Sequence, residues 1–586
     1  MAGSPPLSAP LVHRERATII ALCILAAWLW FPALMPVHVE GFSAAIQSIG
    51  IHLAGGDLQD FDQAYPFDTE FYTLSRLGMN LLTGWLTALS GDGGLALSVL
   101  SVTAFVLLIV TIFLLAKQWT RASTTGILAL LVLFPGISEN AFFFNDNVLS
   151  AALAFAALVL VGWRATPAVA LLAGLCFGSA ILTRTDAALL TPALLLVLSR
   201  ERTSVSNLAL CILCGGIGTA GTVLSVCWAF HTTPFDILQV ASYSVDLWER
   251  PWPTLMFLLE AMFFLGLPVA LLATRGAIAV IFRKDVWTAL LLIGVPVLYL
   301  IVYQGKLWQS RQLLPLAPFV LALALHGWAL LSPLVARNRI TAASLAAYVL
   351  VVVAVPPFAF KDAFVFSDGP RAVLGRLWMP LYWVDWQNRV RTNFAEIEKL
   401  ASEHTSGTEL VLTNDWDADR YTHLVLQEAG FTLSSTETNS SCGPVTETFR
   451  RADREILHIR LHLPVLSRYA LPAMPILFDT YAQPCLDAHP DAPVRYISAW
   501  PQTSNLLGVT SPDPSDLIGE TRPWYKEMTL ITLDAQQVAD LRRYYGAVAE
   551  FEVRRGMIPA PMSRQDLLTQ SARLSAQIGF LSITAR

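Results

Sequence analysis

The stretch Gly94–Ala116 reads GLALSVLSVTAFVLLIVTIFLLA, holds no acidic or basic side chain, and is followed directly by Lys117. A helix needs about 20 mostly apolar residues to cross the roughly 30 Å hydrocarbon core of a bilayer, and this stretch provides them. Similar segments recur on both sides of it, up to residue 360. The sequence therefore predicts a polytopic α-helical membrane protein with about eleven transmembrane helices, at 17–38, 94–116, 122–138, 147–163, 165–183, 185–199, 207–230, 253–274, 286–304, 312–332 and 340–360.

Composition supports a membrane protein with a separate polar tail. Hydrophobic residues make up 54% of the 586 residues and charged residues only 14%, whereas roughly a quarter of a soluble domain is charged. Charge is sparse before residue 360 and ordinary after it, so we divide the chain into a transmembrane domain, 1–360, and a tail, 361–586. The net charge of −5 provides no basic footprint, and we expect no nucleic-acid partner.

The orientation depends on Phe71–Ser90, a segment of the first long loop, 38–93, that carries Arg76 and several hydroxyl groups. It either spans the membrane or lies along its surface as an amphipathic helix. Cytoplasmic loops are enriched in Lys and Arg, and a surface helix satisfies this rule. The inner connections then hold twelve basic residues and the outer connections five. The inner ones are Arg14, Arg16, Lys117, Arg121, Arg164, Arg200, Arg202, Arg275, Arg283, Lys284, Arg337 and Arg339. The outer ones are Arg76, Arg184, Arg250, Lys306 and Arg311. We therefore predict an interfacial helix at 71–90, a cytoplasmic N-terminus and an extracytoplasmic tail.

The sequence pattern of the tail is typical of a soluble α/β domain. Strands are predicted at Glu409–Thr413, Pro475–Phe478, Val494–Ser498 and Met528–Thr532, and helices at Asp417–Gly430 and Asp534–Tyr545. Cys442 and Cys485 are the cysteines of this tail. A disulfide between them would suit an oxidising compartment, and the sequence leaves that pairing open.

Basic side chains at the outer boundary are the first candidates for function, because ionisable groups near the bilayer are costly. Arg184 lies between two apolar segments, and Lys306 and Arg311 directly precede Leu313-Leu-Pro-Leu-Ala-Pro318. Arg offers a bidentate fork and Lys a point charge, which suits a phosphate or pyrophosphate anchored in lipid. The alternative is interfacial snorkelling, or an ion pair of Arg184 with Asp186.

Acidic side chains gather on the same side of the membrane. Glu40 follows the first span and Asp146 opens the fourth, within Asn145-Asp146-Asn147. Both lie at the depth that a base acting near a lipid head group requires. Asp68 and Glu70 precede the interfacial helix, where they either act as a base or favour its N-terminus. Carboxylate oxygens of this kind also bind divalent cations.

The order of these features resembles the GT-C superfamily of polyprenyl-phosphate-sugar-dependent glycosyltransferases. One span is followed by a long acidic outer loop, an interfacial helix, an Asp-containing turn, a Thr-Arg turn and an Arg-x-Leu-Leu-Pro-x-x-Pro segment. The resemblance covers roughly residues 17–360. The GT-C superfamily includes the lipid A aminoarabinose transferases, the protein O-mannosyltransferases and the mycobacterial arabinofuranosyltransferases.

The resemblance implies roles for particular residues. Family members have an Asp-Glu pair after the first span, whose Asp is the usual candidate base, but here that place reads Val39-Glu40. Glu40 then takes the role, or Asp68 or Glu70 does. The family's Asp at the fourth span matches Asp146, which would orient the sugar or a metal. The remaining implied residues are Asn145 and Asn147 beside the sugar, and Lys306, Arg311 and Arg184 on the lipid phosphate.

The function expected from these residues is transfer of a hexose or pentose from a polyprenyl-phosphate donor to a cell-envelope acceptor. The acceptor is a glycolipid, a polysaccharide or a protein, and the reaction takes place at the outer face of a bacterial inner membrane. The resemblance fixes no cofactor, and the one candidate is a divalent cation, Mg or Mn, held by Asp146 or Glu40. The alternatives are a lipid or sugar transporter and a non-catalytic envelope-assembly scaffold. Neither sugar nor acceptor follows from the sequence.

Overall fold

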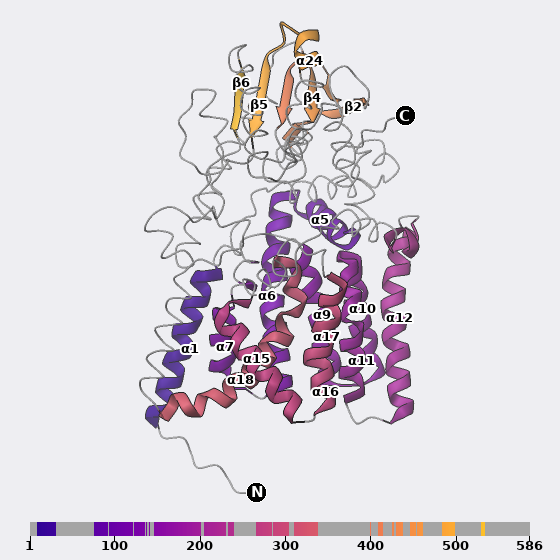
Figure 1. Cartoon of the computed structure of the whole chain (residues 1–586). Helices are drawn as coiled ribbons and strands as arrows, with labels where there is room; N and C mark the ends of the chain where they lie inside the picture. Colours follow the sequence, from indigo (N-terminus) through magenta and orange to yellow (C-terminus); the bar gives the residue numbers. More distant parts are fainter. Residues whose placement is uncertain are drawn as a thin grey trace, which may run out of the picture.

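The computed structural model describes residues 9–30, 76–91, 93–120, 122–134, 136–137, 140, 146–200, 204–229, 232–238, 265–283, 285–303, 310–337, 399, 408–413, 425–426, 429–437, 446–452, 454–460, 483–498 and 529–533 of the 586-residue chain. Up to residue 337 the described residues are helical, and from 410 onward they include six strands. Most of the helices stand roughly side by side (Figure 1).

The helical elements follow the apolar segments of the sequence. They are α1 Ala9–Trp30, α5 Leu77–Ser90, α6 Gly93–Thr120, α7 Thr124–Leu133, α9 Asp146–Trp163, α10 Pro167–Thr183, η2 Thr185–Leu190, α11 Thr191–Arg200, α12 Val205–Ala229, α15 Leu267–Phe282, α16 Val286–Ala289, the π-helix η3 Leu290–Gly294, α17 Val295–Tyr303, η4 Ser310–Leu316 and α18 Ala317–Arg337. Within the described residues, 4 helical stretches are long and apolar enough to cross a membrane, namely Leu95–Thr120, Asp146–Trp163, Val205–Ala229 and Gln312–Ser332. This is a helical membrane fold.

Comparison with the predicted spans gives one correction. The prediction at 253–274 was wrong at its C-terminal boundary, because α15 runs from Leu267 to Phe282 and contains Arg275, which we had placed in a connection. The apolar run Ala277–Phe282 continues the helix past that arginine, and a long side chain within two turns of a helix end can reach the polar surface. The predicted span 340–360 lies outside the described residues, so the total of eleven stays a prediction.

The helices have two distinct ends. At one, which we call the α5 end, lie α5 and the first residues of α9 and η2; α7, α10, α12 and α16 begin at the opposite end (Figure 1). Helix α5 has 14 residues, about 21 Å at 1.5 Å per residue, which is too short to cross the roughly 30 Å hydrocarbon core alone. Its Gly78 packs against the backbone of Leu182 and Thr183 at the end of α10.

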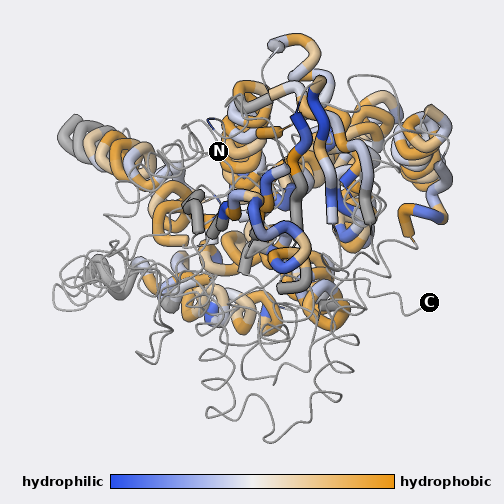
Figure 2. The backbone as a smooth tube through the Cα atoms, turned by 90° about the horizontal axis from the view of Figure 1, so that it is seen from above, coloured by the Kyte–Doolittle hydropathy of each residue, from blue (hydrophilic) through white to orange (hydrophobic). Residues whose placement is uncertain are grey.

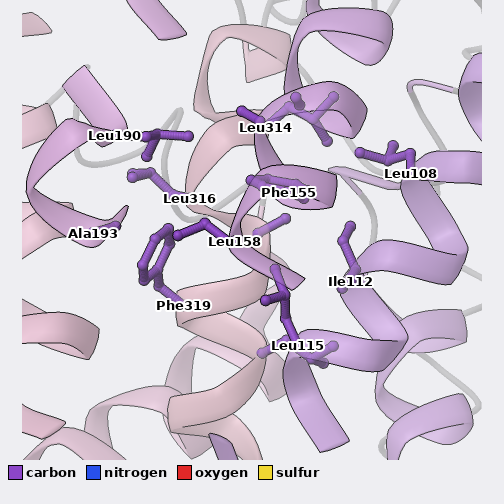
Figure 3. Packing of buried hydrophobic residues seen from close by; sticks show 14 of the residues in the cluster. Leu108, Ile112, Leu115, Phe155, Leu158, Leu190, Ala193, Leu314, Leu316 and Phe319 are labelled. Carbon is purple, nitrogen blue, oxygen red and sulfur yellow. The ribbon is translucent and has the colours of Figure 1, made fainter. Parts of the chain in front are cut away.

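The core between the helices is made of aliphatic and aromatic side chains. Figure 3 shows α6, α9 and α18 meeting through Leu108, Phe155 and Phe319, with Leu190 of η2 and Leu314 of η4 packed beside them. All five side chains are almost fully buried. Large apolar side chains on the outer faces of the helices, such as Ile24 and Leu213, are exposed instead, as expected where lipid covers them. Figure 2 shows that most residues of the helices are hydrophobic.

Two helices approach so closely that only glycine fits between them. A methyl group on Gly276 of α15 would overlap the carbonyl oxygen of Leu323 in α18, and one on Gly327 of α18 would overlap the carbonyl oxygen of Leu272 in α15. Small residues at such crossings let membrane helices pack by backbone contact. Helices α15 and α18 are therefore held in direct backbone contact.

The segment from α16 to α17 is interrupted by the π-helix η3, Leu290–Gly294, and Pro296 is the second residue of α17. Proline has no N–H and its ring collides with the carbonyl four residues earlier, so a widened turn accommodates it. The extra residue in a π-turn rotates everything that follows. Tyr299 of α17 points into the protein and has 0% exposure.

The strands form one mixed sheet of order β2-β3-β4-β1-β5-β6. Strand β1 pairs in parallel with β4 and β5, while β2, β3 and β6 are antiparallel to their neighbours. The strands are β1 Leu410–Thr413, β2 Thr432–Glu437, β3 Thr446–Arg451, β4 Arg454–Arg460, β5 Val494–Ser498 and β6 Thr529–Leu533. In Figure 1 the sheet lies beyond the α5 end. Its placement outside the membrane in a domain of its own, 361–586, stays a prediction.

Three predicted strands are confirmed and three observed strands were not predicted. The segments 409–413, 494–498 and 528–532 correspond to β1, β5 and β6, whereas β2, β3 and β4 are new. The predicted strand 475–478, the helix 534–545 and most of the helix 417–430 lie outside the described residues.

The sheet region contains a buried ion pair and a disulfide-bonded cysteine. Arg454 of β4 donates to Glu409 at 2.9 Å, with side-chain exposures of 2% and 5%. The guanidinium of Arg451 lies over the ring of Phe431, 4.7 Å from its centroid. Cys485 is disulfide-bonded. Cys442, the candidate partner, lies outside the described residues.

Candidate functional site

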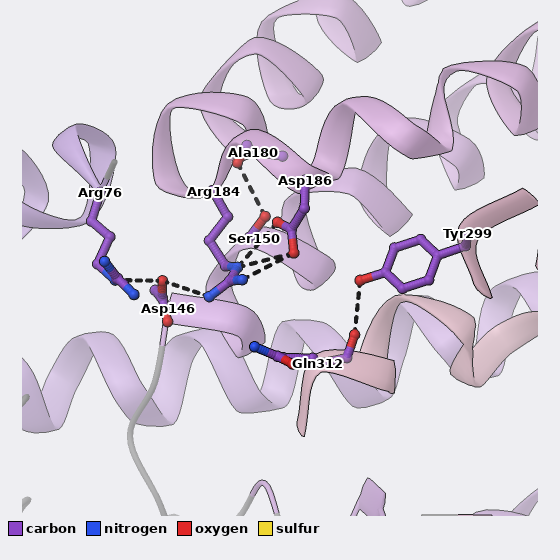
Figure 4. Close-up of polar contacts among 8 residues, drawn as sticks. All are labelled: Arg76, Asp146, Ser150, Ala180, Arg184, Asp186, Tyr299 and Gln312. Atoms are coloured by element: carbon purple, nitrogen blue, oxygen red, sulfur yellow. Dashed lines mark hydrogen bonds and ion pairs between the residues drawn. The ribbon is translucent and has the colours of Figure 1, made fainter. Parts of the chain in front are cut away.

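A network of arginine and aspartate side chains lies at the α5 end. Its centre is Asp146, the first residue of α9, whose side chain is 3% exposed. Nε of Arg76 lies 2.8 Å from Oδ2 of Asp146, and Nη1 of Arg184 lies 3.1 Å from the same oxygen. Figure 4 shows both guanidinium groups pointing toward this one carboxylate.

Arg184 is held on its other side by Asp186. Its Nε donates to Oδ1 at 3.0 Å and to Oδ2 at 3.2 Å, and its Nη2 donates to Oδ2 at 3.0 Å. Fork-shaped contacts of this kind fix the plane of the guanidinium as well as its position. Arg184 therefore bridges two carboxylates in a defined orientation.

Local structure explains why these side chains meet. Arg184 lies between α10 and η2 in an extended conformation, with φ −155° and ψ 126°, which turns its side chain toward α9. Asp146 lies in the first turn of α9, where the helix dipole favours a negative charge. Arg76 directly precedes α5, and the contact of Gly78 with Leu182 and Thr183 brings that arginine beside them.

The four charges compensate one another. Two arginines and two aspartates, with side-chain exposures between 3% and 17%, have zero net charge. Burying unpaired charges costs several kcal/mol, roughly 3–5 when one partner of a buried pair is removed. We call Arg76, Asp146, Arg184 and Asp186 the charged quartet. It ties the starts of α5, α9 and η2 together.

The start of η4 lies beside the charged quartet. The hydroxyl of Tyr299 donates to the carbonyl oxygen of Gln312 at 2.8 Å, and α17 packs against η2, the element that carries Asp186. Helix η4 also packs against α9, whose first residue is Asp146, and Figure 4 shows Gln312 in the same region. Because Arg311 precedes Gln312 in the chain, the backbone that carries this predicted phosphate ligand begins next to the quartet.

The predicted site residues divide into those that the structure brings together and those that it does not describe. Asp146 and Arg184, predicted for different roles, are in direct contact, and the alternative ion pair of Arg184 with Asp186 is present. Asn147 is buried beside Asp146. Five other predicted site residues lie outside the described residues, namely Glu40, Asp68, Glu70, Asn145 and Lys306. For Arg311 only the backbone is described.

Sequence reasoning gave no functional role to Arg76 or Asp186, although both belong to the charged quartet. One signal was present for Arg76, because it is the only basic residue of an otherwise acidic first loop. Its partner is 70 positions away in the chain, which no local pattern reveals.

The described residues do not form a cation site. Among them, no group of three or more His, Cys, Asp or Glu side chains is placed to hold a metal. The Asp146 carboxylate faces two guanidinium groups, which repel a cation. A divalent ion at Glu40, the other predicted ligand, stays a prediction because Glu40 lies outside the described residues, and no chemical step below depends on it.

Comparisons with known proteins find structural relatives only. No family model matches the chain, and no curated protein matches it. The Archaeoglobus fulgidus oligosaccharyltransferase, solved with Zn and sulfate, has 12% identity and a TM-score of 0.43, over 82% of this chain and 68% of its own.

This chain is similar in structure to ArnT from Cupriavidus metallidurans, a GT-C glycosyltransferase, over nearly the whole length of ArnT. The form bound to undecaprenyl phosphate has 16% identity and a TM-score of 0.51, over 88% of this chain and 98% of its own. The apo form gives the same score and identity, over 90% and 99%. The chain therefore shares its overall fold with ArnT, as its sequence resemblance to the GT-C superfamily implied.

Proposed function

We propose that this protein is a membrane glycosyltransferase that moves a hexose or pentose from a polyprenyl-phosphate donor to a cell-envelope acceptor. The observation that carries the proposal is the fold shared with ArnT, a protein that binds undecaprenyl phosphate, over 98% of that chain. The reaction would take place at the α5 end, where the charged quartet lies.

The chemistry of a lipid phosphate suits this end. The quartet has no net charge, so Lys306 and Arg311 would supply the positive charge that attracts an anionic donor. Arg184, fixed by Asp186, would present its guanidinium to the phosphate oxygens. Charge on these oxygens grows as the sugar departs, and preorganised cations stabilise the transition state more than the ground state.

The proposed reaction is a displacement at the anomeric carbon. The bond between that carbon and the phosphate oxygen breaks, and its electron pair stays on the phosphate. The acceptor hydroxyl oxygen forms the new bond, and its proton passes to a carboxylate, with Glu40 the first candidate and Asp68 or Glu70 the next. Asp146, buried and doubly paired, would hold the arginines and the sugar in place.

Two observations support an extracytoplasmic location for the α5 end. Disulfides persist in oxidising compartments, and Cys485 is disulfide-bonded in the sheet region that lies beyond this end. The described basic residues Lys117, Arg164, Arg200 and Arg283 lie at or near helix termini of the opposite end, as the positive-inside rule requires for a cytoplasmic face.

The test is a binding and transfer assay on the purified full-length protein. Undecaprenyl phosphate is the binding probe, and a panel of undecaprenyl-phosphate sugars with an envelope lipid extract tests transfer. Lys306→Ala and Arg311→Ala are expected to lower transfer about 100-fold or more, the usual effect of removing one transition-state donor. Lys117→Ala and Arg283→Ala, exposed at the opposite end, are matched controls that should transfer normally.

Each outcome has a clear meaning. Transfer that depends on Lys306 and Arg311 but not on the controls supports the proposal. Binding of undecaprenyl phosphate without transfer of any sugar would favour an assembly scaffold. Normal transfer by both the Lys306 and Arg311 variants would refute the phosphate role.

A further inference from the structure

The buried residue Tyr299 makes a hydrogen bond to η4, and the sequence of η4 explains why this bond forms. Helix η4, Ser310–Leu316, is a 3-10 helix with Pro315 inside it. In a 3-10 helix the carbonyl of residue 312 accepts from the N–H of residue 315, but proline has no N–H. The hydroxyl of Tyr299 donates to that same carbonyl at 2.8 Å. It supplies the donor that Pro315 lacks.

Tyr299 makes this hydrogen bond from a buried position in α17. Its side chain is fully buried, so the phenol has no access to bulk water and its hydroxyl must be satisfied inside the protein. The residue lies in α17, which directly follows the π-helix η3, and the wider turn of η3 sets which face of α17 points inward. Helix α17 also packs against η2, which contains Asp186.

The bond therefore joins two parts of the proposed phosphate site. On one side, α17 packs against the element that holds Arg184 through Asp186. On the other side, Tyr299 fixes the backbone of Gln312, and Arg311 is the preceding residue. We propose that Tyr299 is a positioning residue for the donor phosphate, acting through the Gln312 carbonyl on the backbone that carries Arg311. This inference rests on the proposed function.

The first test compares Tyr299→Phe with the wild-type protein. The substitution keeps the ring and removes only the hydroxyl. We expect affinity for undecaprenyl phosphate to fall about tenfold, the effect of losing one net hydrogen bond, with the KM for the lipid donor raised and the KM for the acceptor unchanged. Thr219→Val is the matched control, because Thr219 of α12 donates across helices to the Gly174 carbonyl at 3.2 Å, remote from η4.

The second test is a rescue. Pro315→Ala restores an N–H that can reach the Gln312 carbonyl, so Tyr299→Phe/Pro315→Ala should bind undecaprenyl phosphate more tightly than Tyr299→Phe alone. A merely structural loss of the hydroxyl would not be repaired in this way. In addition, Tyr299→Phe should add little to the defect of Arg311→Ala, because both act through the same group.

The outcomes separate this inference from the proposed function. Wild-type affinity in Tyr299→Phe, or an equal loss in Thr219→Val, overturns the positioning role while the glycosyltransferase proposal stands. No binding of undecaprenyl phosphate to the wild-type protein overturns both. A weakened Tyr299→Phe variant that Pro315→Ala does not improve contradicts the route through the Gln312 carbonyl.

Discussion

The two ends of the helices are built by different rules. At the opposite end, α7, α10, α12 and α16 each begin with a side chain that accepts a hydrogen bond from a backbone N–H three residues later. These capping residues are Ser123, Thr166, Ser204 and Asp285. At the α5 end, Arg76 and Arg184 precede α5 and η2 without making a cap and pair with Asp146 instead.

The difference separates local stability from long-range organisation. A cap satisfies one orphan N–H and depends on residues three apart, so it needs no tertiary structure. The charged quartet joins residues 38 and 70 positions apart and forms only when the helices have assembled. The opposite end is therefore held by local contacts, and the α5 end by contacts that depend on the tertiary structure.

The largest effect is expected from Arg184→Ala. It leaves two carboxylates without their shared partner, and removing one member of a buried network costs about 3 kcal/mol or more. Transfer should be lost and the thermal unfolding midpoint in detergent should fall. The double variant Arg184→Ala/Asp186→Asn keeps the Arg76–Asp146 pair and a net charge of zero, so it should regain most of the stability but none of the transfer. An unchanged midpoint in Arg184→Ala would show that the quartet contributes nothing to assembly.

An intermediate effect is expected from Gly78→Ala in α5. The added methyl group would lie 3.0 Å from the backbone N of Thr183 and 3.1 Å from the carbonyl carbon of Leu182, and backbone cannot yield as a side chain does. Overpacking of this kind costs about 1–3 kcal/mol, and it should displace Arg76 from Asp146 and lower transfer. Gly216→Ala in α12 is the control, because nothing lies within 4 Å of its Cβ. That variant should be stabilised by up to about 1 kcal/mol, and equal effects in both would argue against tight packing of α5 on α10.

The smallest effect is expected from Asp285→Ala at the opposite end, about 1 kcal/mol for one cap, with transfer unchanged. Hydrogen bonds from the Thr288 side chain and backbone hold the pKa of Asp285 below its ordinary value of 3.8. Because the folded-state pKa is depressed, the stabilisation is present above pH 3.8 and disappears as pH falls through the folded value. The stability difference between wild type and variant should therefore shrink below about pH 4. A difference that stays constant down to pH 3 would contradict this role.

Sequence patterns predicted the features that depend on short stretches of chain. Hydropathy located the cores of most described helices, and Asp146 was correctly placed at the start of the fourth one. Strands β1 and β5 were found because they are central and contain apolar runs. Strands β3 and β4 were missed because their buried positions include Glu447 and Arg454, which read as solvent-facing residues.

The candidate site was only partly predictable, because sequence patterns reveal features of short stretches of chain and not contacts between distant ones. Arg184 and Asp146 were recognised from their depth in the membrane, but their contact depends on how α9, α10 and η2 are arranged in three dimensions. The roles of Arg76 and Tyr299 depend on contacts between α5 and α10 and on a π-helix, η3. Neither leaves a periodic signal in the sequence.

The glycine contact between α15 and α18 has a mechanical consequence. With backbone against backbone at Gly276 and Gly327, the two helices have no layer of side chains that could absorb a shift between them. We therefore expect the two helices to tilt together, and α18 continues directly from η4. If they do, a change in membrane thickness that tilts α15 would also shift the backbone at Arg311 in η4.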